Sequence, residues 1–586
     1  MTREEELLAK IQEMCDQDLE ADVIKMIDAL PDGERTYKVV GLLARTLSNL
    51  AGMIRSGYVE DVQDPDALDR RALEILAETA EEGKDDPNWW CRNGYTRMGL
   101  GMEAEAIPYF EHVMALIPDD PETQEFWSDV PEAIGQCKAI LDFLDHPKAK
   151  EKPYFMRRSM VICIQRDAAY RLDIDPFVPR IAAVDGIEGL VCERAGDESA
   201  STVARIKGCF YGEEFDMEID RVEDFDPSGL RVSTYFNDSD IELVQELHSG
   251  YAVDMRFGTD DPSRWFHLQM CIADMAVPDM LVAYDLSACQ ALSGHLVRRI
   301  ASSAVPPHPD FAYTIWDEAD SRGTDVWLYT RGLQRMGLPD IEIMHSSPRH
   351  AVCHRKLIRA VVKYMFWNRH DKASSVPKID LPVAYMAGGV PLYVRLLPWP
   401  EAIKDGSRSA GTPGSLRTRL KRMNSDSCVM FAYPDEQAVA EDVYQPLWMM
   451  DDFLDDGHED DTKFIICEEE NTRMHRLAME TFDIVERVAR LTPEKVMLRL
   501  WLEDDDGELD TLWARLTKYV DRNNFEIRIE DDEHAGEDNG SQLAFIDETD
   551  ERISTWLIEA GEHCVTPESI YLLDAEPGLK KELGLE

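Results

Sequence analysis

The stretch DPNWWCRNGYTRMGLGMEAEAIPYFEHVMALIPDD, residues 86–120, carries the pattern that decides the fold of the first part of this chain. Small residues at Gly94 and Ala106 allow two helices to approach closely, and Phe110 fills the space between them. Pro118 has no amide hydrogen and therefore ends the second helix. The stretch predicts a helix, a tight turn and a second helix, with the informative residues at fixed offsets: Trp90, Gly94, Gly101, Ala106, Phe110 and Pro118.

This pattern resembles a tetratricopeptide repeat, a helical pair that serves as a scaffold for binding other proteins. The chain departs from the repeat where Arg97 stands in place of a tyrosine. Because a single repeat cannot bury its own apolar face, neighbouring helices are required. Apolar residues at helical spacing predict them at 4–30, 37–56, 67–82 and 121–144. Residues 1–150 are therefore predicted to form an all-α, tetratricopeptide-like domain, with a plain helical bundle as the alternative.

The composition is that of a multi-domain protein. The chain has 586 residues, of which 44% are hydrophobic, which is enough for more than one core. Its first residues, MTREEELLAK, are acidic where a signal peptide is basic, and no apolar run reaches the roughly 18 residues of a membrane span. Twelve cysteines are scattered without a CxxC pair, which indicates reduced thiols. We therefore expect a cytoplasmic protein without a membrane partner.

The net charge is the second strong feature of the sequence. The 115 acidic and 62 basic residues give a formal charge of -53, which repels nucleic acid phosphates. Acidic residues are densest at 451–461, 503–510 and 530–538. A solvated surface, adaptation to high salt and capture of a basic protein are three explanations of such runs. Nucleic acid is not an expected partner, whereas a basic protein is a candidate partner.

From about residue 154 the pattern changes to short strands that alternate with helices. This mixture predicts an α+β domain over residues 151–445, with two subdomains as one arrangement. Residues 446–586 are predicted to form a small, acidic, mostly β domain, in which strands at 496–502 and 511–516 pair as a hairpin. In the α+β domain, strands are predicted at 159–165, 204–211, 214–219, 230–235, 251–256, 281–285, 311–316, 324–329, 340–344, 392–397 and 427–433, and helices at 238–248, 262–275, 287–302 and 350–368.

Two resemblances extend beyond the N-terminal helices. VWLYTRGLQRMGLPDIEIM, residues 326–344, resembles the central signature of an uncharacterised bacterial domain family. Tyr329 and Arg331 replace the two histidines of that signature, so the resemblance implies that a histidine-dependent activity of relatives is lost here. Gly332 is then expected to form a turn and Leu333 a core contact. The positions that match the signature are Thr330, Gly332, Leu333, Pro339 and Glu342.

Residues 461–579 resemble the YegJ-like domain family, whose function is unknown. The resemblance rests on the helical stretch 474–489, on Trp513 and on VTPESIYLL, residues 565–573. Asp510 stands at the start of a dipeptide that is Glu-His in the family, and the closing Asp-Trp of the family is absent. The resemblance implies a small, mostly β domain and transfers no activity.

One group of residues has the spacing of a metal site. His350 and His354 are four residues apart and would share a helix face, as zinc-binding histidines do, and His345 and Cys353 accompany them in HSSPRHAVCHRK. Ala351, however, occupies the place of the general-base glutamate in the HExxH motif. We therefore predict a partly buried helix start with no bound metal and no cofactor, and a metal site is the alternative.

Two other segments contain residues that could bind a ligand or take part in catalysis. The basic segment KDGSRSAGTPGSLRTRLKR begins at Lys404 and ends at Arg422, and its Gly/Ser-rich loop could cradle phosphate. It lacks the order of a P-loop, so docking on the acidic surface of the chain itself is the favoured interpretation, and its role stays open. SACQALSGH contains Ser287, Cys289 and His295, but its apolar spacing predicts a packed helix rather than a catalytic triad.

The sequence favours a non-enzymatic protein that binds another protein. An immunity-like or antitoxin-like role is one version of this hypothesis, because complementary charge raises the rate of association with a basic toxin. The alternative is an enzyme with a metal or phosphate-ligand site in the central domain. No catalytic or cofactor-binding residue is assigned, and the sequence does not determine the partner or the oligomeric state.

Overall fold

The structure is a computed structural model of the 586-residue chain. It describes residues 2–145, 158–367, 379–450 and 463–586, apart from gaps at 56–63, 195–200, 403–413, 415–426, 504–508, 530–541 and 546–551 and shorter gaps of one to three residues. The predicted boundary at residue 150 and the acidic runs 451–461 and 530–538 lie outside the described residues, as do nearly all of the basic segment 404–422 and most of the run 503–510.

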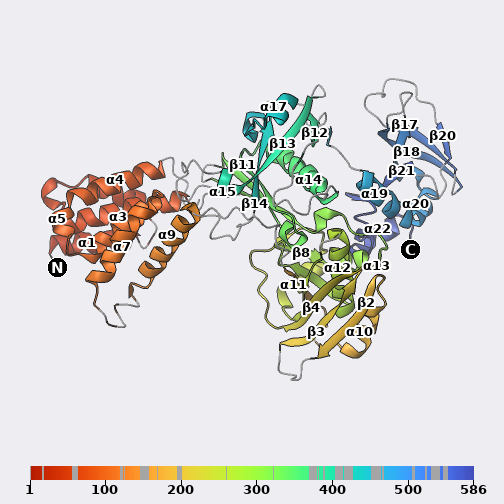
Figure 1. The fold of residues 1–586 in the computed structure, drawn as a ribbon, viewed down its shortest axis with the longest axis horizontal. Helices are drawn as coiled ribbons and strands as arrows, with labels where there is room; N and C mark the ends of the chain where they lie inside the picture. Colours follow the sequence, from red (N-terminus) through yellow and green to blue (C-terminus); the bar gives the residue numbers. More distant parts are fainter. Residues whose placement is uncertain are drawn as a thin grey trace.

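The N-terminal part is helical throughout its described residues, as predicted, and lies at one end of the molecule in Figure 1. Asp64 and Asp86 each cap a helix by accepting an amide hydrogen two residues further on, and a proline follows each of them. The helices are α1 (Arg3–Cys15), α2 (Glu20–Asp28), α3 (Tyr37–Arg55), α4 (Pro65–Glu78), α5 (Ala80–Gly83), α6 (Pro87–Gly99), α7 (Glu103–Leu116) and α9 (Asp129–Asp145).

The predicted close contact between α6 and α7 is present. Ala106 and Phe110 are fully buried, and a Cβ atom at Gly94 would lie 2.6 Å from the Phe110 ring. Only a residue without a side chain permits this approach at position 94. Gly101 makes the turn between the two helices with a φ of 75°, a value that favours glycine. The aromatic, small and turn residues of the quoted stretch thus occupy the positions that their offsets predict.

The central part contains two sheets among its described residues. The first has the strand order β2-β3-β4-β6-β1-β7-β8-β5. Val161 and Cys163 of β1 face the main core, whereas Ile162 and Ile164 face a smaller cluster beneath α11 (Asp238–Glu246). This burial on both faces explains the apolar run in β1. The strands are β1 (Arg158–Gln165), β2 (Ile187–Arg194), β3 (Thr202–Phe210), β4 (Glu213–Val222), β5 (Arg231–Val232), β6 (Gly250–Arg256), β7 (Met280–Asp285) and β8 (Gln290–Ser293), and α10 (Ile174–Ala182), α12 (Pro262–Ala276) and α13 (Gly294–Ser302) pack in the main core.

The second sheet has the order β16-β12-β13-β14-β11-β10-β9, with β15 paired to β14. Leu328 of β10 faces the main core, where α14 (Ala351–Trp367) packs, and Trp327 faces a separate cluster with α15 (Trp399–Ala402). A short α17 (Glu436–Glu441) follows β14. The strands are β9 (Thr314–Ala319), β10 (Val326–Arg331), β11 (Asp340–Ser346), β12 (Ala384–Met386), β13 (Val390–Pro398), β14 (Ser427–Tyr433), β15 (Gln445–Pro446) and β16 (Lys463–Phe464).

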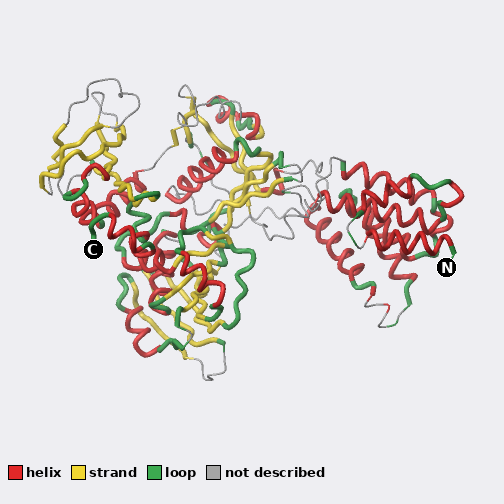
Figure 2. The backbone as a smooth tube through the Cα atoms, turned by 180° about the vertical axis from the view of Figure 1, so that it is seen from behind, coloured by secondary structure: helices red, strands yellow, loops and turns green. Residues whose placement is uncertain are grey.

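The C-terminal part is a sheet of order β20-β19-β18-β17-β21-β22 with helices beside it, seen from behind in Figure 2. The predicted hairpin is confirmed, because β17 and β18 pair as antiparallel strands with Leu500 opposite Leu512. Tyr571 accepts the amide of Tyr235 over 3.1 Å, which ties the end of the chain to the first central sheet. The elements are β17 (Val496–Glu503), β18 (Leu509–Asp521), β19 (Asn524–Ile529), β20 (Gln542–Phe545), β21 (Ile553–Ala560), β22 (His563–Val565), α19 (Glu468–Glu480), α20 (Phe482–Ala489), α21 (Leu572–Ala575) and α22 (Pro577–Glu582).

Some local predictions are wrong. The helix predicted at 287–302 begins only at Gly294, because Gln290–Ser293 pair with β7 as strand β8. The strand predicted at 230–235 is reduced to Arg231–Val232, and the helix predicted at 474–489 is interrupted at Thr481 between α19 and α20. In each case a tertiary contact or a local turn outweighs the apolar spacing. Helix α10 and strand β2 were not predicted.

Candidate functional site

The four candidate metal ligands do not form one cluster. The Nδ1 atom of His345 lies 2.9 Å from Asp325 Oδ2. The Nδ1 atoms of His350 and His354 lie within 2.8 Å of serine hydroxyls, and the centroids of their rings are 6.1 Å apart. His354 and Cys353 are buried in α14, so this helix start is more deeply buried than predicted. Among the described residues, no three or more His, Cys, Asp or Glu side chains are placed to hold a metal ion.

The residues of SACQALSGH also separate. The Ser287 hydroxyl accepts the amide of Met160 at 3.4 Å, and Arg331 donates to Cys289 Sγ at 3.1 Å. His295 Nε2 lies 3.5 Å from an oxygen of Asp240. Each of the three side chains therefore has a different neighbour. The structure does not bring them together as a triad.

The signature at residues 326–344 behaves as the resemblance implies. Gly332 has a φ of 111°, and a Cβ atom there would lie 2.8 Å from the carbonyl oxygen of Ala312. Leu333 is fully buried. The turn at Gly332 starts a short 3-10 helix, Leu333–Met336, which carries Arg335 into the interior.

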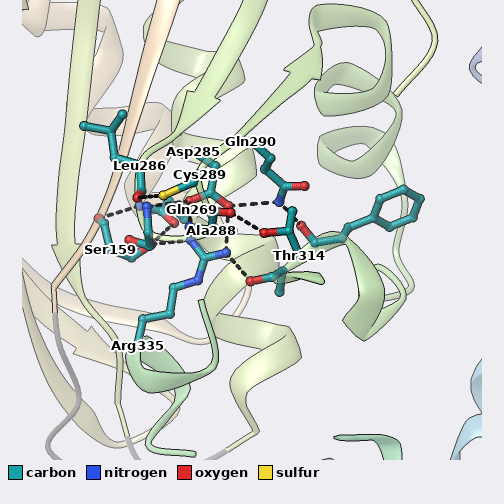
Figure 3. A network of polar contacts seen from close by, with 12 residues as sticks. Ser159, Gln269, Asp285, Leu286, Ala288, Cys289, Gln290, Thr314 and Arg335 are labelled. Carbon is teal, nitrogen blue, oxygen red and sulfur yellow. Dashed lines mark hydrogen bonds and ion pairs between the residues drawn. The ribbon is translucent and has the colours of Figure 1, made fainter. Parts of the chain in front are cut away.

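A buried polar network surrounds Arg335 (Figure 3). The guanidinium donates to both carboxylate oxygens of Asp285 at 2.7 Å and to the Ser159 hydroxyl at 2.9 Å. Gln269 accepts from the Ser159 hydroxyl at 2.7 Å, and Gln290 donates to Asp285 at 3.1 Å. Arg335 is 1% exposed and Asp285 is not exposed at all. Because the charges are paired and sealed from solvent, this network joins structural elements and offers no place for a ligand.

A different arrangement is found in the N-terminal helices, where α3, α6 and the segment leading into α9 enclose a cavity of about 330 Å³. Two arginines, Arg45 and Arg92, line it, with Asn49 and Asn88 beside them. The exposed ring of Phe126 adds an apolar surface. The carboxylate of Asp129 also lines it and accepts a hydrogen bond from Tyr95. Two positive charges against one negative charge, with amide groups and an aromatic ring, suit a peptide carrying an acidic group.

Arg92 is the decisive side chain of this cavity. No described residue makes a hydrogen bond or an ion pair with its guanidinium group. Burial lowers the pKa of Arg92, an effect that Asp86 opposes and that Arg45 reinforces. The partly buried charge of Arg92 beside the exposed charge of Arg45 favours an anion placed between or beside the two guanidinium groups.

Hydrogen bonds between side chains other than Arg92 hold the helices around the cavity together. The hydroxyls of Ser48 and Thr96 join α3 to α6 over 2.8 Å, and Tyr95 donates to Asp129 at 2.8 Å. Gly41 provides the space for the guanidinium, since a Cβ atom there would lie 2.6 Å from Arg92 Nη1. The walls are therefore preformed, and the arginine lies across the glycine of α3.

Arg97, which departs from the repeat pattern, is not among the residues lining the cavity. Its guanidinium lies 4.1 Å from the centroid of the Tyr109 ring and donates to Asn93 Oδ1 at 2.7 Å. Arg92, which lines the cavity, was not predicted as a site residue from the sequence. A signal was available, because Arg45 with Asn49 and Asn88 with Arg92 are pairs spaced by four residues, and such pairs share a helix face.

Comparisons with known proteins give family matches for the central part of the chain. Among the described helices, none is long and apolar enough to cross a membrane. Neither the curated proteins nor the solved structures contain a match to this chain. Residues 159–307, which contribute Asp285 to the buried network, match the family described as "Protein of unknown function (DUF4026) N-terminal", and residues 313–431, which contribute Arg335, match its C-terminal counterpart.

Proposed function

We propose that this protein binds a partner protein, and that the cavity between α3, α6 and α9 receives a carboxylate of a partner segment. The observation that carries the proposal is the Arg92 guanidinium, which lines the cavity without an acceptor among the described residues. The resemblance of residues 86–120 to a tetratricopeptide repeat supports it, because scaffolds of this kind present binding surfaces on stacked helices. A carboxylate would pair with Arg92 through two parallel hydrogen bonds.

The other groups of the cavity suit the rest of such a segment. Asn49 and Asn88 carry amide groups that can donate and accept, as the backbone of an extended peptide requires. Phe126 is 76% exposed and offers a ring against which an apolar side chain can pack. The thiol of Cys91 and the carboxylate of Asp129 also line the cavity, but burial and Asp129 raise the pKa of this thiol, which disfavours the reactive thiolate.

The partner as a whole is proposed to be basic. The net charge of -53 attracts a basic protein at long range, while a single carboxylate of that protein binds in the cavity at short range. An immunity-like or antitoxin-like role in the cytoplasm is one version of this proposal. We also propose that the C-terminal part belongs to the YegJ-like family, and this proposal assigns no activity to it.

The experiment is a selection of peptides from a library with free C-termini on the immobilised full-length protein, followed by fluorescence anisotropy. Arg92→Gln is expected to weaken binding of the selected peptides by at least about tenfold, as loss of a charged hydrogen-bond pair predicts. Arg71→Gln is the matched control, because Arg71 pairs with Asp28 on an exposed surface and does not line the cavity.

Two outcomes would contradict the proposal. Peptides that bind Arg92→Gln as tightly as the wild-type protein would show that the cavity is not the site. A recovered protein partner whose association rate is equal in low and high salt would remove the basic-partner part, because attraction between exposed charges is screened beyond about 8 to 10 Å at physiological ionic strength.

A further inference from the structure

The first central sheet carries a second cavity, of about 400 Å³, far along the chain from the proposed peptide site. The last residue of β1, the last residues of β4 and the first residues of β6 form its wall, and the end of α11 closes one side. Arg221 of β4 lies opposite Tyr251 of β6 in the strand register. Three strands therefore position the lining residues on a rigid frame.

Gly250 holds the strands together at this wall. It lies opposite Ile164 of β1, and a Cβ atom at position 250 would come within 1.9 Å of the carbonyl oxygen of Cys163. Any other residue would push β6 away from β1 and disturb the cavity. The frame thus depends on a glycine whose role the sequence alone did not reveal.

Two polar groups of the lining lack partners among the described residues. Gln165 is 5% exposed, and its amide oxygen is buried without a hydrogen bond, while its amide nitrogen makes a long contact of 3.5 Å to the Tyr170 carbonyl. The Nε atom of Arg221 is also buried without a partner, and the described residues offer its guanidinium no ion pair. Buried polar groups in folded proteins are nearly always satisfied, so each unsatisfied group calls for a ligand or water.

The two groups have opposite requirements. Gln165 Oε1 needs a hydrogen-bond donor, and the Arg221 guanidinium needs an anionic acceptor. The rim adds three carboxylates, from Glu223, Asp224 and Glu246, and one exposed guanidinium group, from Arg171. Because the carboxylates outnumber this positive charge, the rim favours a positive charge on the ligand. An inorganic anion alone would leave Gln165 unsatisfied and face these carboxylates, whereas a metal cation would be repelled by the arginine.

We propose that this cavity binds a small zwitterion of the α-amino acid class. The carboxylate pairs with Arg221, and the ammonium group donates to Gln165 Oε1 and faces the acidic rim. The volume of about 400 Å³ lies within the range of small-molecule sites. The charged lining explains why the ligand is polar at both ends. The site is independent of the peptide site proposed above, since the two share no residue.

The test is isothermal titration calorimetry of the full-length protein with L-alanine, L-glutamate and L-lysine. Acetate, inorganic phosphate and methylamine serve as probes that carry only one of the two charges. We expect at least one amino acid to bind, and each single-charge probe to bind at least about tenfold more weakly. Arg221→Gln and Gln165→Leu are each expected to weaken amino acid binding at least about tenfold. Arg205→Gln is the matched control, because Arg205 lies exposed on β3 of the same sheet and pairs with Glu218.

Several outcomes would overturn the proposal. They are the absence of binding by all three amino acids, binding of acetate or phosphate as tight as that of the amino acids, and unchanged binding by Arg221→Gln. Circular dichroism at the titration temperature establishes that each variant is folded. If Gln165→Leu fails to fold, Arg221→Gln and Arg221→Lys decide the question, because residue 221 lies near the end of β4 and is only partly buried.

Discussion

Arg335 and Arg92 both carry a positive charge into the protein, but the regions around them satisfy that charge differently. Arg335 meets two oxygens of Asp285 and the Ser159 hydroxyl and is sealed from solvent. Arg92 lies at the wall of a cavity, and the described residues provide it with no acceptor. A buried charge with its counter-ion contributes to architecture, even though Arg335 Nε has no hydrogen-bond acceptor among the described residues, whereas a charge without a counter-ion marks a place for a ligand.

The Asp285–Arg335 pair also spans the boundary between the two segments that match the family models. Ser159 and Asp285 belong to the segment that matches the N-terminal family model, and Arg335 belongs to the segment that matches the C-terminal one. The bidentate pair therefore joins the two matched segments inside one shared core.

The largest expected effect is that of Asp285→Asn. This change leaves the buried Arg335 charge without its counter-ion, which typically costs about 3 to 5 kcal/mol of unfolding free energy. Urea denaturation followed by circular dichroism measures it. The double change Asp285→Leu with Arg335→Met removes both charges and is expected to recover much of the loss. A loss below about 1 kcal/mol in Asp285→Asn would break the comparison, since such a value is typical of an exposed pair.

The buried carboxylate of Glu470 is a second charge with a full set of nearby partners, and its contribution to stability should depend on pH. Glu470 lies 3.1 Å from His308 Nε2 and accepts two hydrogen bonds of 2.9 Å from Arg473. Burial by itself would raise the pKa of Glu470, but the hydrogen bonds from His308 and Arg473 and the charge of Arg473 outweigh burial and hold the pKa well below its usual value. The His308 ring accepts the amide of Asp310 through Nδ1, so Nε2 carries the proton that is donated to Glu470.

A carboxylate whose pKa is lowered in the folded state stabilises the fold above its unfolded pKa, and that contribution is lost as the pH falls. Glu470→Gln is therefore expected to cost about 1 to 3 kcal/mol at pH 7, the usual value for a charged hydrogen bond. The difference from wild type should shrink below about pH 4.3, the ordinary pKa of glutamate. Urea titrations at several pH values test this, and a difference that stays constant from pH 7 to pH 3 would contradict it.

The smallest expected effect on stability is that of Arg92→Gln. Because the guanidinium has no acceptor in the described structure and burial lowers its pKa, removing the charge should change the unfolding free energy by less than about 0.5 kcal/mol. Peptide binding by the same variant should nevertheless be lost. The pairing of an unchanged stability with a lost binding activity separates a ligand site from a structural arginine. A decrease in unfolding free energy of more than about 2 kcal/mol would show that Arg92, like Arg335, has a structural role.

The sequence by itself determined the class of each part of this protein. The offsets of Gly94, Ala106 and Phe110 specify a helix pair, because the distance between two packed helices depends on the size of the residues at their contact. Strands β1, β17 and β18 were predicted from short apolar stretches, and in β1 the uninterrupted stretch reflects burial on both faces of the sheet. These are local rules that act within a few residues.

The tertiary structure alone decided which charges are paired. Asp285 and Arg335 are 50 residues apart, and Arg92 and Arg45 lie on different helices, so their relations depend on how distant elements pack. The same packing separated the histidines of α14 and converted residues 290–293 from a predicted helix into strand β8. Whether a charge is satisfied is a property of the folded neighbourhood, and no spacing within one segment determines it.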